Sequence, residues 1–557
     1  MMRCIHCMYI FFLLSAAGIS CKKASDNPQP TPVIETFKLI TATINSNEAT
    51  PQNALNVLPV IKVIFTAAMD RNTVVNGIVL SQSNGTAVAL NASYQNNDSV
   101  LILQPVIALA FITKYILSVN STLKSKKNTA LSTPAVINFI TQIDSSDKFP
   151  VIGDSALLDK VQKQTFKYFW DFGHPVSGMA RERNTSGDLV TTGGTGFGIM
   201  AIVAAVNRKF ISRAAGVTRV LKITDFLTNS CTQYHGAFAH WINGASGATI
   251  PFSTDDDGAD LVETSYLMQG LLTAKQYFNT ADITETDLRN KINILWNGVD
   301  WNWFRQGSQN VLYWHWSPNK AWIMNAQISG WNEALITYVM AAASVNNSIP
   351  KAVYDSGWAR NGAMKNNNTF FGYVLPLGLN IGGPLFFEHY SFLGINPRGL
   401  KDNYADYQTQ TINHTLINYE YCKANPKQYY GYSSQCWGLT ASDTPNNGYN
   451  ANAPDNDIGV ITPTAAISSL PYTPTQSMAA LHFFYYKLGD KMWGDYGFYD
   501  AFSLQDAWFA NSTLAIDQGP AIVMIENYRT SLLWNLFTSC PEVKQGLIKL
   551  GFTAPYL

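Results

Sequence analysis

The sequence predicts a multidomain protein in which an N-terminal β-sandwich is followed by a larger all-α domain. The chain has 557 residues, which is more than one ordinary domain contains. Over residues 36–142 the apolar residues alternate with polar ones in short runs separated by turn residues, which is typical of a sandwich of short strands. From residue 154 to residue 557 they recur at helical spacing, in stretches joined by long loops rich in Gly, Pro and aromatic residues. Residues 143–153 are predicted to link the two domains.

The first domain is predicted to be a spacer. Its strands are expected at residues 60–65, 77–80, 87–90, 99–103, 114–119 and 136–140. Their order and spacing resemble those of the bacterial Ig-like domains that are common in surface and secreted proteins. The region contains no cluster of acidic residues, His or Cys, so catalysis is not expected there, and weak glycan binding is the alternative.

The second domain is predicted to be a ring of paired helices. Helices are expected at residues 155–172, 197–210, 216–229, 257–278, 285–296, 330–344, 402–422, 475–488, 519–539 and 541–550. So many helices with few strand signals favour an (α/α) toroid. In that architecture the loops of one face surround an open cleft, and loops of this length usually carry function.

The composition favours a neutral ligand and argues against several partners. Lys and Arg together number 38, as do Asp and Glu, so the chain has no basic excess for nucleic acid or an anionic membrane surface. Charged residues make up only 14% of the chain and aromatic residues 13%, with 14 Trp and 27 Tyr. Aromatic faces stack on sugar rings, so this balance suits a polyhydroxylated ligand, although most of the rings must belong to the core. We expect a monomer without a cofactor.

The N-terminus predicts export. Arg3 precedes an apolar run at residues 8–18 that is too short to span a membrane as a mature helix, and small residues then lead to Cys21. The pattern resembles a bacterial lipobox, so residues 1–21 are predicted to be a lipoprotein-type signal peptide with Cys21 as the lipidated N-terminus; ordinary cleavage near Cys21 is the alternative. Residues 22–35 are polar and rich in proline, which is typical of an extended tether. We therefore expect an exported protein held in the cell envelope by a lipid anchor, facing the periplasm or at the cell surface.

Four cysteines lie outside this leader and lack the spacing of metal ligands: Cys231, Cys422, Cys436 and Cys540. A disulfide between Cys422 and Cys436 and four buried free thiols are both compatible with the sequence.

The strongest chemical signal is an acidic stretch at the start of the predicted helix 257–278. On that helix Asp256, Asp260 and Glu263 would share one face at positions i, i+4 and i+7. Like charges one turn apart destabilise an isolated helix by roughly 0.2–0.5 kcal/mol per pair, so such a cluster suggests acid–base chemistry. A surface helix with surplus capping residues is the structural alternative. Residues 255–258 lack the alternating spacing of a calcium loop, so no metal is predicted.

Further stretches carry candidate site residues. Glu333 follows Trp331 in an aromatic-rich region, where partial desolvation is expected to raise its pKa and suit it to act as a general acid; a capping Glu is the alternative. Glu388 and His389 lie among bulky aromatic residues and are interpreted as substrate-positioning groups, with a buried His equally compatible. Asp517 precedes a predicted helix start, where an N-cap role is the alternative.

Several carboxyls together with many aromatic residues in an exported protein favour glycoside hydrolysis. In that reaction one carboxylic acid protonates the leaving oxygen, and one carboxylate activates water or attacks the sugar. The sequence contains no GxSxG, HExxH or GxxxxGK[ST] motif, which argues against the chemistries that those motifs serve.

A set of short runs occurs in a fixed order along the helical region. The runs are Gly194-Thr-Gly-Phe-Gly198, the spaced acids Asp256, Asp260 and Glu263, Gly330-Trp-Asn-Glu333, Gly383-Pro-Leu-Phe386, His389-Tyr-Ser-Phe392, Cys436-Trp-Gly-Leu-Thr-Ala-Ser442 and Ile516-Asp-Gln-Gly-Pro520. Together they resemble the bacterial glucoamylase-like domain that includes the endo-β-1,2-glucanases of glycoside hydrolase family 144. The resemblance spans nearly all of residues 150–557.

The resemblance implies an (α/α)6 barrel and an inverting, metal-independent endo-β-1,2-glucanase that releases sophoro-oligosaccharides. By position, the catalytic carboxyls are Glu333, Asp517, Asp260, Glu263 and Asp256. We predict Glu333 as the general acid and Asp517 as the base, acting directly or through a water or a substrate hydroxyl, with the Asp260/Glu263 pair as the alternative base. The predicted sugar contacts are Trp316, Trp331, Glu388, His389, Tyr390, Trp437 and Arg181. The alternatives are an exo-acting enzyme that releases sophorose, a hydrolase of another glucan linkage, and a lipid-anchored glycan-binding protein.

Overall fold

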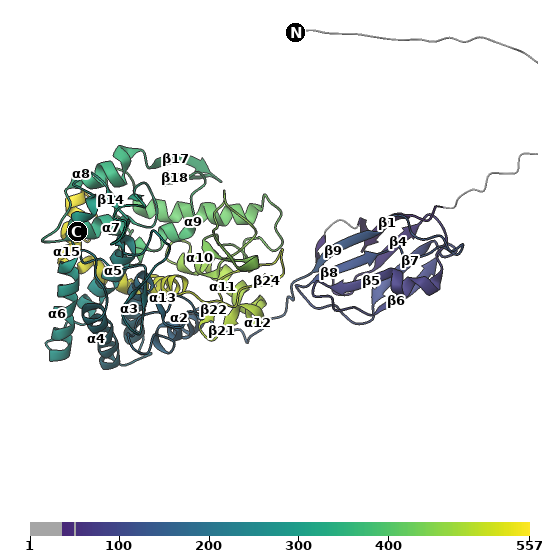
Figure 1. Ribbon diagram of the computed structural model, residues 1–557, viewed down its shortest axis with the longest axis horizontal. Coiled ribbons are helices and arrows are strands. Elements are labelled where there is room, and N and C mark those ends of the chain that lie inside the picture. Colours follow the sequence, from purple (N-terminus) through teal and green to yellow (C-terminus); the bar gives the residue numbers. More distant parts are fainter. Residues whose placement is uncertain (1–35, 49–51) are drawn as a thin grey trace, which may run out of the picture.

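The computed structural model describes residues 36–48 and 52–557. Figure 1 shows a β-rich domain followed by a larger, mainly helical domain, with one linker between them. The predicted signal peptide, the lipidation site Cys21 and the tether at residues 22–35 lie outside the described residues. No helix in the described part of the chain is both long enough and apolar enough to cross a membrane.

The first domain is a sandwich of two sheets, as predicted. One sheet has the order β2 (Asn47–Glu48), β1 (Leu39–Ile44), β4 (Ile61–Phe65), β7 (Val100–Pro105), β6 (Leu90–Gln95). The other has the order β3 (Gln52–Leu55), β9 (Ala135–Thr141), β8 (Lys114–Val119), β5 (Ile78–Gln82), and a short helix α1 (Val74–Gly77) precedes β5. Alternate residues of β4 and β8 are buried between the sheets, which is the physical basis of the alternation in the sequence. The strand predicted at 87–90 is wrong, because β6 begins only at Leu90.

The helical domain has an inner layer of helices that are buried almost all round. These are α3 (Thr192–Asn207), α5 (Leu261–Tyr277), α7 (Leu335–Ala343), α10 (Pro463–Ser468) and α13 (Ala515–Thr530). Neighbours follow in the order α7, α5, α3, α13, α10, and the 3₁₀ segment Ser391–Leu393 contacts both α7 and α13. A helix that is apolar on every side must lie inside a larger assembly, so this layer forms the core of the barrel.

The closest approach in the inner layer is between α3 and α5, and two glycines permit it. A Cβ at Gly196 would lie 2.1 Å from the Tyr266 carbonyl oxygen, and one at Gly270 would lie 2.2 Å from the Gly196 carbonyl oxygen. Real Cβ atoms do not approach backbone so closely, so each position needs Gly. This accounts for part of the glycine-rich run that begins at Gly194.

Outer helices cover this layer and complete the predicted (α/α)6 barrel. They are α2 (Asp154–Trp170), α4 (Arg213–Asn229), α6 (Ile283–Gly298), α9 (Tyr407–Ala424), α11 (Pro474–His482), α14 (Leu532–Ser539) and α15 (Pro541–Leu550). One expectation is wrong, and one helix was not foreseen. The helix predicted at 519–539 is interrupted, because Ser531 adopts a left-handed conformation (φ 58°) between α13 and α14. The short α10 was not predicted, because six residues carry too little periodicity.

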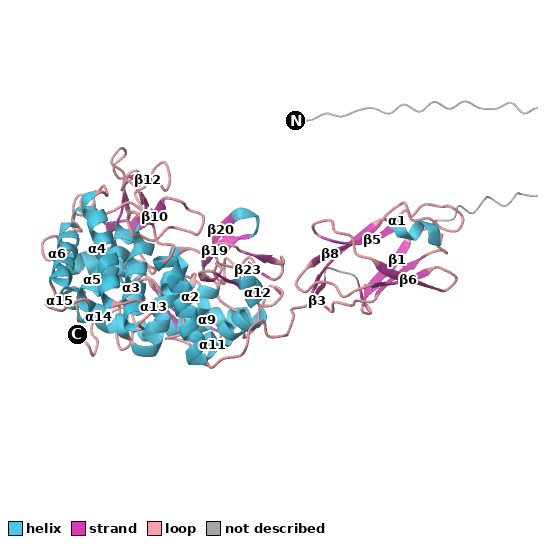
Figure 2. Ribbon diagram, turned by 90° about the horizontal axis from the view of Figure 1, so that it is seen from below, coloured by secondary structure: helices cyan, strands magenta, loops and turns pink. Residues whose placement is uncertain are grey.

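The loops contain more strand than the sequence indicates, in the form of small hairpins. Those near the candidate site are β10 (Leu189–Thr191), β11 (Trp241–Asn243), β12 (Thr249–Ile250), β13 (Ala259–Asp260), β15 (His315–Trp316), β19 (Ala441–Thr444), β20 (Gly448–Ala451), β22 (Gly497–Phe498), β23 (Phe502–Ser503) and β24 (Trp508–Phe509). The others are β14 (Leu312–Tyr313), β16 (Gln327–Ile328), β17 (Lys365–Phe370), β18 (Tyr373–Leu377) and β21 (Trp493–Gly494), with short helices α8 (Lys351–Val353) and α12 (Gly489–Met492). Figure 2 shows β10, β12, β19, β20 and β23 along one side of the helical domain.

The two domains touch through apolar and polar contacts, and Ile112 of the first domain is buried against the helical domain. The Lys114 ammonium lies 2.9 Å from the Asp506 carboxylate, and Asn53 Nδ2 donates to Gln505 Oε1 at 2.8 Å. Both partners in the helical domain belong to the turn between β23 and β24.

All four cysteines outside the leader are free thiols, and Cys422 and Cys436 are both buried in the helical domain. The disulfide considered from the sequence is therefore absent from the described structure.

Candidate active site

The first group of carboxyls surrounds Asp260, but not on one helix face as predicted. The helix α5 begins at Leu261, and Asp260 is its N-cap, with Oδ1 accepting the backbone N–H of Glu263 at 2.9 Å. Asp256 lies in the preceding loop. The three carboxyls nevertheless come together, because the loop folds back and β13 pairs with β15, which places His315 beside both aspartates.

Two histidines that the sequence analysis missed flank Asp260. Its Oδ2 lies 3.1 Å from His240 Nδ1 and 3.6 Å from His315 Nε2. Burial alone would lower the pKa of His240, but the charges of Glu263, Asp260 and Asp256 outweigh it and raise that pKa to about 9. Burial alone would raise the pKa of Asp260, but its contacts with the two histidines hold it below the usual range. Asp260 is therefore a carboxylate held between imidazolium groups.

Asp256 differs from Asp260 in its pKa. Burial, followed by the charge of Asp260, raises the pKa of Asp256 to about 6. The two aspartates are only four residues apart in the sequence, yet Asp260 makes the closer contact with a histidine. Their different environments thus separate the pKa values of two carboxyls that share one site.

Glu263 binds to the N-terminal end of α3. Its Oε2 accepts the backbone N–H of Gly193 at 2.7 Å and the hydroxyl of Thr191 at 3.3 Å. A Cβ at Gly193 would lie only 2.7 Å from Glu263 Oε2, so the contact requires Gly. Burial, followed by the charge of Asp260, raises the pKa of Glu263 in spite of these donors.

Glu333 lies in the turn before α7, two residues earlier than the first helical residue. Its carbonyl oxygen accepts hydrogen bonds from Ser391 Oγ at 2.5 Å and from Tyr266 OH at 3.4 Å, which fix this turn. The side chain is half-buried. Burial is the largest cause that raises the pKa of Glu333, to about 7, and the charges of Asp260 and Glu263 add to it. The raised pKa predicted from the sequence is confirmed, and it suits a general acid near neutral pH.

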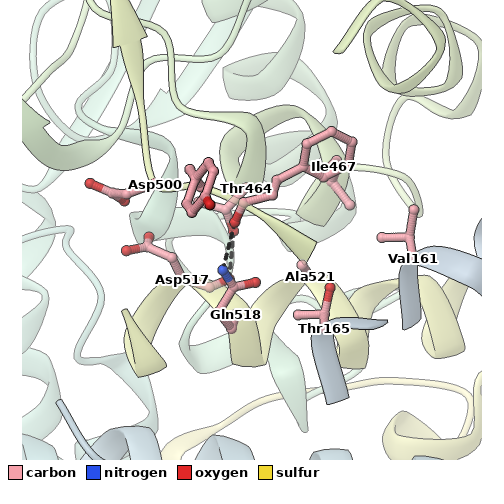
Figure 3. Close-up of a pocket in the computed structure, with 10 residues that line it drawn as sticks. Val161, Thr165, Thr464, Ile467, Asp500, Asp517, Gln518 and Ala521 are labelled. Atoms are coloured by element: carbon pink, nitrogen blue, oxygen red, sulfur yellow. Dashed lines mark hydrogen bonds between the residues drawn. The ribbon is translucent and has the colours of Figure 1, made fainter. Parts of the chain in front are cut away.

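The second group of carboxyls lies on α13 and on the loop before β23. Asp517 is in the first turn of α13, which begins at Ala515, so the expected helix start at 519 and the N-cap alternative are both wrong. Figure 3 shows the carboxyls of Asp517 and Asp500 facing each other. Both residues are buried, and burial is the largest cause that raises both pKa values, that of Asp500 to about 7. The sequence analysis missed Asp500.

Tyr390 lies between the two groups. Its pKa is raised first by burial and then by Asp517, Tyr449, Glu333 and Glu263, so its phenol is within electrostatic reach of both groups of acids. Tyr390 is only 8% exposed, whereas Tyr449, on β20, is 54% exposed at the solvent side of the second group. The inner-helix ends of α5, α7 and α13 thus converge on one space.

Four of the predicted sugar contacts are wrong, because their side chains are inside the protein. Glu388 is fully buried and accepts hydrogen bonds from Trp331 Nε1 at 2.9 Å and Gln410 Nε2 at 2.8 Å. His389 is 2% exposed and bonded to a serine hydroxyl, and Trp437 is 0% exposed. Trp331 itself is 5% exposed.

Glu388 also faces a buried histidine, His414. The Nδ1 of His414 lies 2.8 Å from Glu388 Oε1 and its Nε2 lies 2.9 Å from the Gly383 carbonyl oxygen. Glu388 Oε1 thus has three nitrogen partners inside the core: Trp331 Nε1, Gln410 Nε2 and His414 Nδ1. The role of Glu388 is to hold the wall of the barrel.

Two more of the predicted sugar contacts, Arg181 and Trp316, are not fully buried. Arg181 is half-buried, donates to the carbonyl oxygens of Gly187 and Phe172, each at 2.7 Å, and has its guanidinium over the Phe172 ring; that it binds sugar stays a prediction. Trp316 is half-buried and packs edge-on against Trp303 in an aromatic cluster beside β15. It follows His315 in a strand, so its side chain points away from the face that carries that histidine.

One set of side chains could hold a metal ion. The ligand atoms of His240, Asp256 and Asp260 lie within 4.8 Å of one another. The raised pKa of His240 favours its imidazolium form, which has no lone pair for a metal, and each carboxylate oxygen of Asp260 already accepts one hydrogen bond. We interpret the cluster as an ion-pair network.

The fold and the site together define a class: an (α/α)6 barrel whose loops on one side hold two separate groups of carboxyls, the arrangement of acid–base glycoside hydrolases. Residues 325–541 match the family described as "Putative glucoamylase", and residues 40–141 match the bacterial Ig-like domain. The endo-β-1,2-glucanase of Chitinophaga pinensis is 49% identical over 73% of this chain and 100% of its own, with a TM-score of 0.71. The chain therefore belongs to this glucoamylase-like family of glycoside hydrolases, with an Ig-like domain added at its N-terminus.

Two further relatives come from Parabacteroides distasonis. A β-1,2-glucanase structure is 38% identical over 92% of this chain and 73% of its own, with a TM-score of 0.70. An exo β-1,2-glucooligosaccharide sophorohydrolase that acts at the non-reducing end is 45% identical over 433 residues, which are 74% of this chain. The matched region spans 60% of the length of that sophorohydrolase.

Proposed function

We propose that this protein hydrolyses β-1,2-linked glucan by inverting acid–base catalysis, with Glu333 as the general acid and Asp517 as the base. The observation that carries the proposal is the pKa of Glu333, which burial raises to about 7 at a site that a second group of carboxyls also faces. The names of the Chitinophaga and Parabacteroides relatives support β-1,2-glucan as the substrate. No cofactor takes part in this reaction.

In this reaction one proton is donated on one side of the sugar and one proton is accepted on the other side. The Glu333 carboxyl proton moves to the leaving glycosidic oxygen as the bond to the anomeric carbon breaks. A water on the opposite face attacks that carbon and gives its proton to Asp517, directly or through a second water or a substrate hydroxyl. The Glu333 carboxylate then regains a proton, and the Asp517 carboxyl loses one, to solvent.

The Asp260/Glu263 pair is the weaker candidate for the base. Asp260 already accepts hydrogen bonds from His240 and from the Glu263 amide, and a carboxylate stabilised in this way has little basicity left. Its charge instead supports the raised pKa of Glu333.

We favour endo cleavage, with exo release of sophorose as the alternative, because the relatives include both kinds of enzyme. The test is to incubate the protein with linear β-1,2-glucan and follow the products by chromatography. A ladder of oligosaccharides that shorten together supports endo cleavage, and sophorose alone from the first time point supports exo action. Absence of any product from this glucan would refute the proposed substrate.

A lipid-anchored glycan-binding protein is the alternative from another class. Glu333→Gln should abolish hydrolysis while glucan binding persists, whereas a pure binding protein never hydrolyses. Glu420→Gln is the matched control, because Glu420 lies on the outer helix α9 in an ion pair with Lys423. Anchoring through Cys21, with the Ig-like domain as a spacer and the protein as a monomer, completes the proposal; Cys21→Ala should release the protein from the membrane fraction.

A further inference from the structure

The barrel wall gains no stability from placing the carboxyl of Asp500 beside that of Asp517. The two carboxyls face each other (Figure 3), and the residues are 3% and 4% exposed. Neither has an ion-pair partner within the described residues. Asp500 Oδ1 and Asp517 Oδ2 are both buried and have no hydrogen-bond donor among those residues. Two acceptors in this position need a proton between them, because two buried like charges in contact are strongly unfavourable.

Asp500 is held in place from its other side. Its Oδ2 accepts the backbone N–H of Asp443 at 2.7 Å, and its own backbone N–H donates to the Ser512 carbonyl oxygen at 2.9 Å. The Asp443 carboxylate is balanced by Arg183, at 3.1 Å, which also pairs with Glu182. The carboxyl of Asp500 therefore has one oxygen anchored and the other free to face Asp517.

The remaining titratable groups near the pair are two tyrosines. Tyr449 and Tyr390 both lie within electrostatic reach of Asp517, and burial keeps the phenol of Tyr390 protonated by raising its pKa. Next to the pair is a small cavity of about 10 Å³, lined in part by Thr165, Thr464 and Gln518 (Figure 3). That volume suits a single water molecule.

We propose that Asp500 is a positioning residue for Asp517, and that the two carboxyls act as one dyad that shares a single proton. This inference rests on the proposed role of Asp517 as the base. In the reactive state the dyad carries one negative charge. A proton from the attacking water moves to Asp517 while the shared proton settles on Asp500, so the dyad becomes neutral as the water oxygen bonds to the anomeric carbon. Loss of one proton to solvent restores the dyad.

Asp500→Asn and Asp500→Ala form a matched pair for the test. In Asp500→Asn, the amide oxygen can still accept the Asp443 N–H, and the amide Nδ2 can donate to Asp517 as the shared proton does. In Asp500→Ala, Asp517 loses its donor, so its buried carboxylate is harder to form. We expect kcat of Asp500→Ala to fall about tenfold or more, with a smaller change in KM and with the acidic limb of the pH–rate profile moved to higher pH. Asp500→Asn should restore most of the loss.

Two measurements keep the test independent of folding and of the reaction itself. Thermal unfolding identifies any variant that has lost its fold. Infrared difference spectroscopy at neutral pH should show a protonated carboxyl band in the wild type that is lost in both Asp500→Asn and Asp517→Asn. That band is expected even if the substrate assignment fails.

The outcomes separate the two ideas. If Asp517→Asn is inactive but Asp500→Ala keeps the wild-type kcat and pH profile, the dyad is refuted, whereas the assignment of Asp517 as the base is retained. Equal impairment of folded Asp500→Asn and Asp500→Ala also refutes proton sharing. If Asp517→Asn is fully active, the assignment of Asp517 as the base is wrong, and the dyad proposal that depends on it is refuted too. An unchanged carboxyl band in Asp500→Asn overturns the shared proton directly.

Discussion

Replacing Glu333 with Gln should make the protein more stable above neutral pH. The pKa of Glu333 rises from 4.5 to about 7 on folding, mainly by burial. Between these values the folded chain holds a proton that the unfolded chain has released, so the free energy of unfolding falls as pH rises. At about 1.4 kcal/mol per pKa unit, the ionised side chain costs about 3 kcal/mol above pH 7. Gln carries no charge and removes this cost.

The assay is urea unfolding of wild type and Glu333→Gln at pH 5 and pH 8, followed by far-UV circular dichroism and tryptophan fluorescence. At pH 5 the variant should differ little from wild type, and at pH 8 it should be more stable by up to about 3 kcal/mol. Glu420→Gln, on the outer helix α9, serves as the control for replacing a carboxyl by an amide away from the site. A Glu333→Gln variant that is equally or less stable at pH 8 would refute the argument that burial sets this pKa.

The remaining predictions concern the walls of the site. Glu388→Ala leaves Trp331 Nε1, Gln410 Nε2 and His414 Nδ1 buried without the oxygen that they share, so the free energy of unfolding should fall by about 3–5 kcal/mol, and calorimetry should show a lower Tm. Gly196→Ala should strongly destabilise the α3–α5 contact, whereas Gly298→Ala, which has open space around it, should not; comparison of the two Tm values checks this. His240 gains stability from its raised pKa below about pH 6.5 and loses it as pH rises through about 9, so His240→Asn should flatten Tm against pH over that window. Dialysis against EDTA should leave hydrolysis unchanged, because the His240 cluster is interpreted as an ion-pair network; loss of activity that a divalent metal restores would overturn this interpretation.

The architecture could be predicted from the sequence because periodicity is local. The helix at 541–550 is found with its bounds intact as α15, since Pro541 starts it and Gly551 ends it. The break between α13 and α14 could not be predicted, because Ser531 is not a residue that signals a left-handed conformation.

The site could be predicted only in part, because pairing depends on tertiary contacts. The acids Asp260, Glu263 and Glu333 do converge, and Asp517 faces the same space through Tyr390. His240 and Asp500 were missed, since a single His or Asp outside an acidic run gives no signal. A search for polar residues directly after short aromatic runs would have found His315, which follows Tyr313-Trp314, but not His240, which follows Ala239.

Four of the predicted sugar contacts failed for a related reason. Aromatic and polar residues in one short run are as typical of a satisfied core as of a sugar site. Trp331, Glu388 and Trp437 belong to the core, and only their burial reveals it.

The connection between the two domains has a mechanical consequence. Lys114 of the Ig-like domain binds Asp506, at the tip of the β23–β24 hairpin, and that hairpin starts two residues after Asp500. A pull on the N-terminal end of the chain is carried by the covalent linker at residues 143–153 into α2, because an exposed ion pair such as Lys114–Asp506 is weak. The Ig-like domain thus touches the helical domain close to the loop that carries Asp500 without loading that loop.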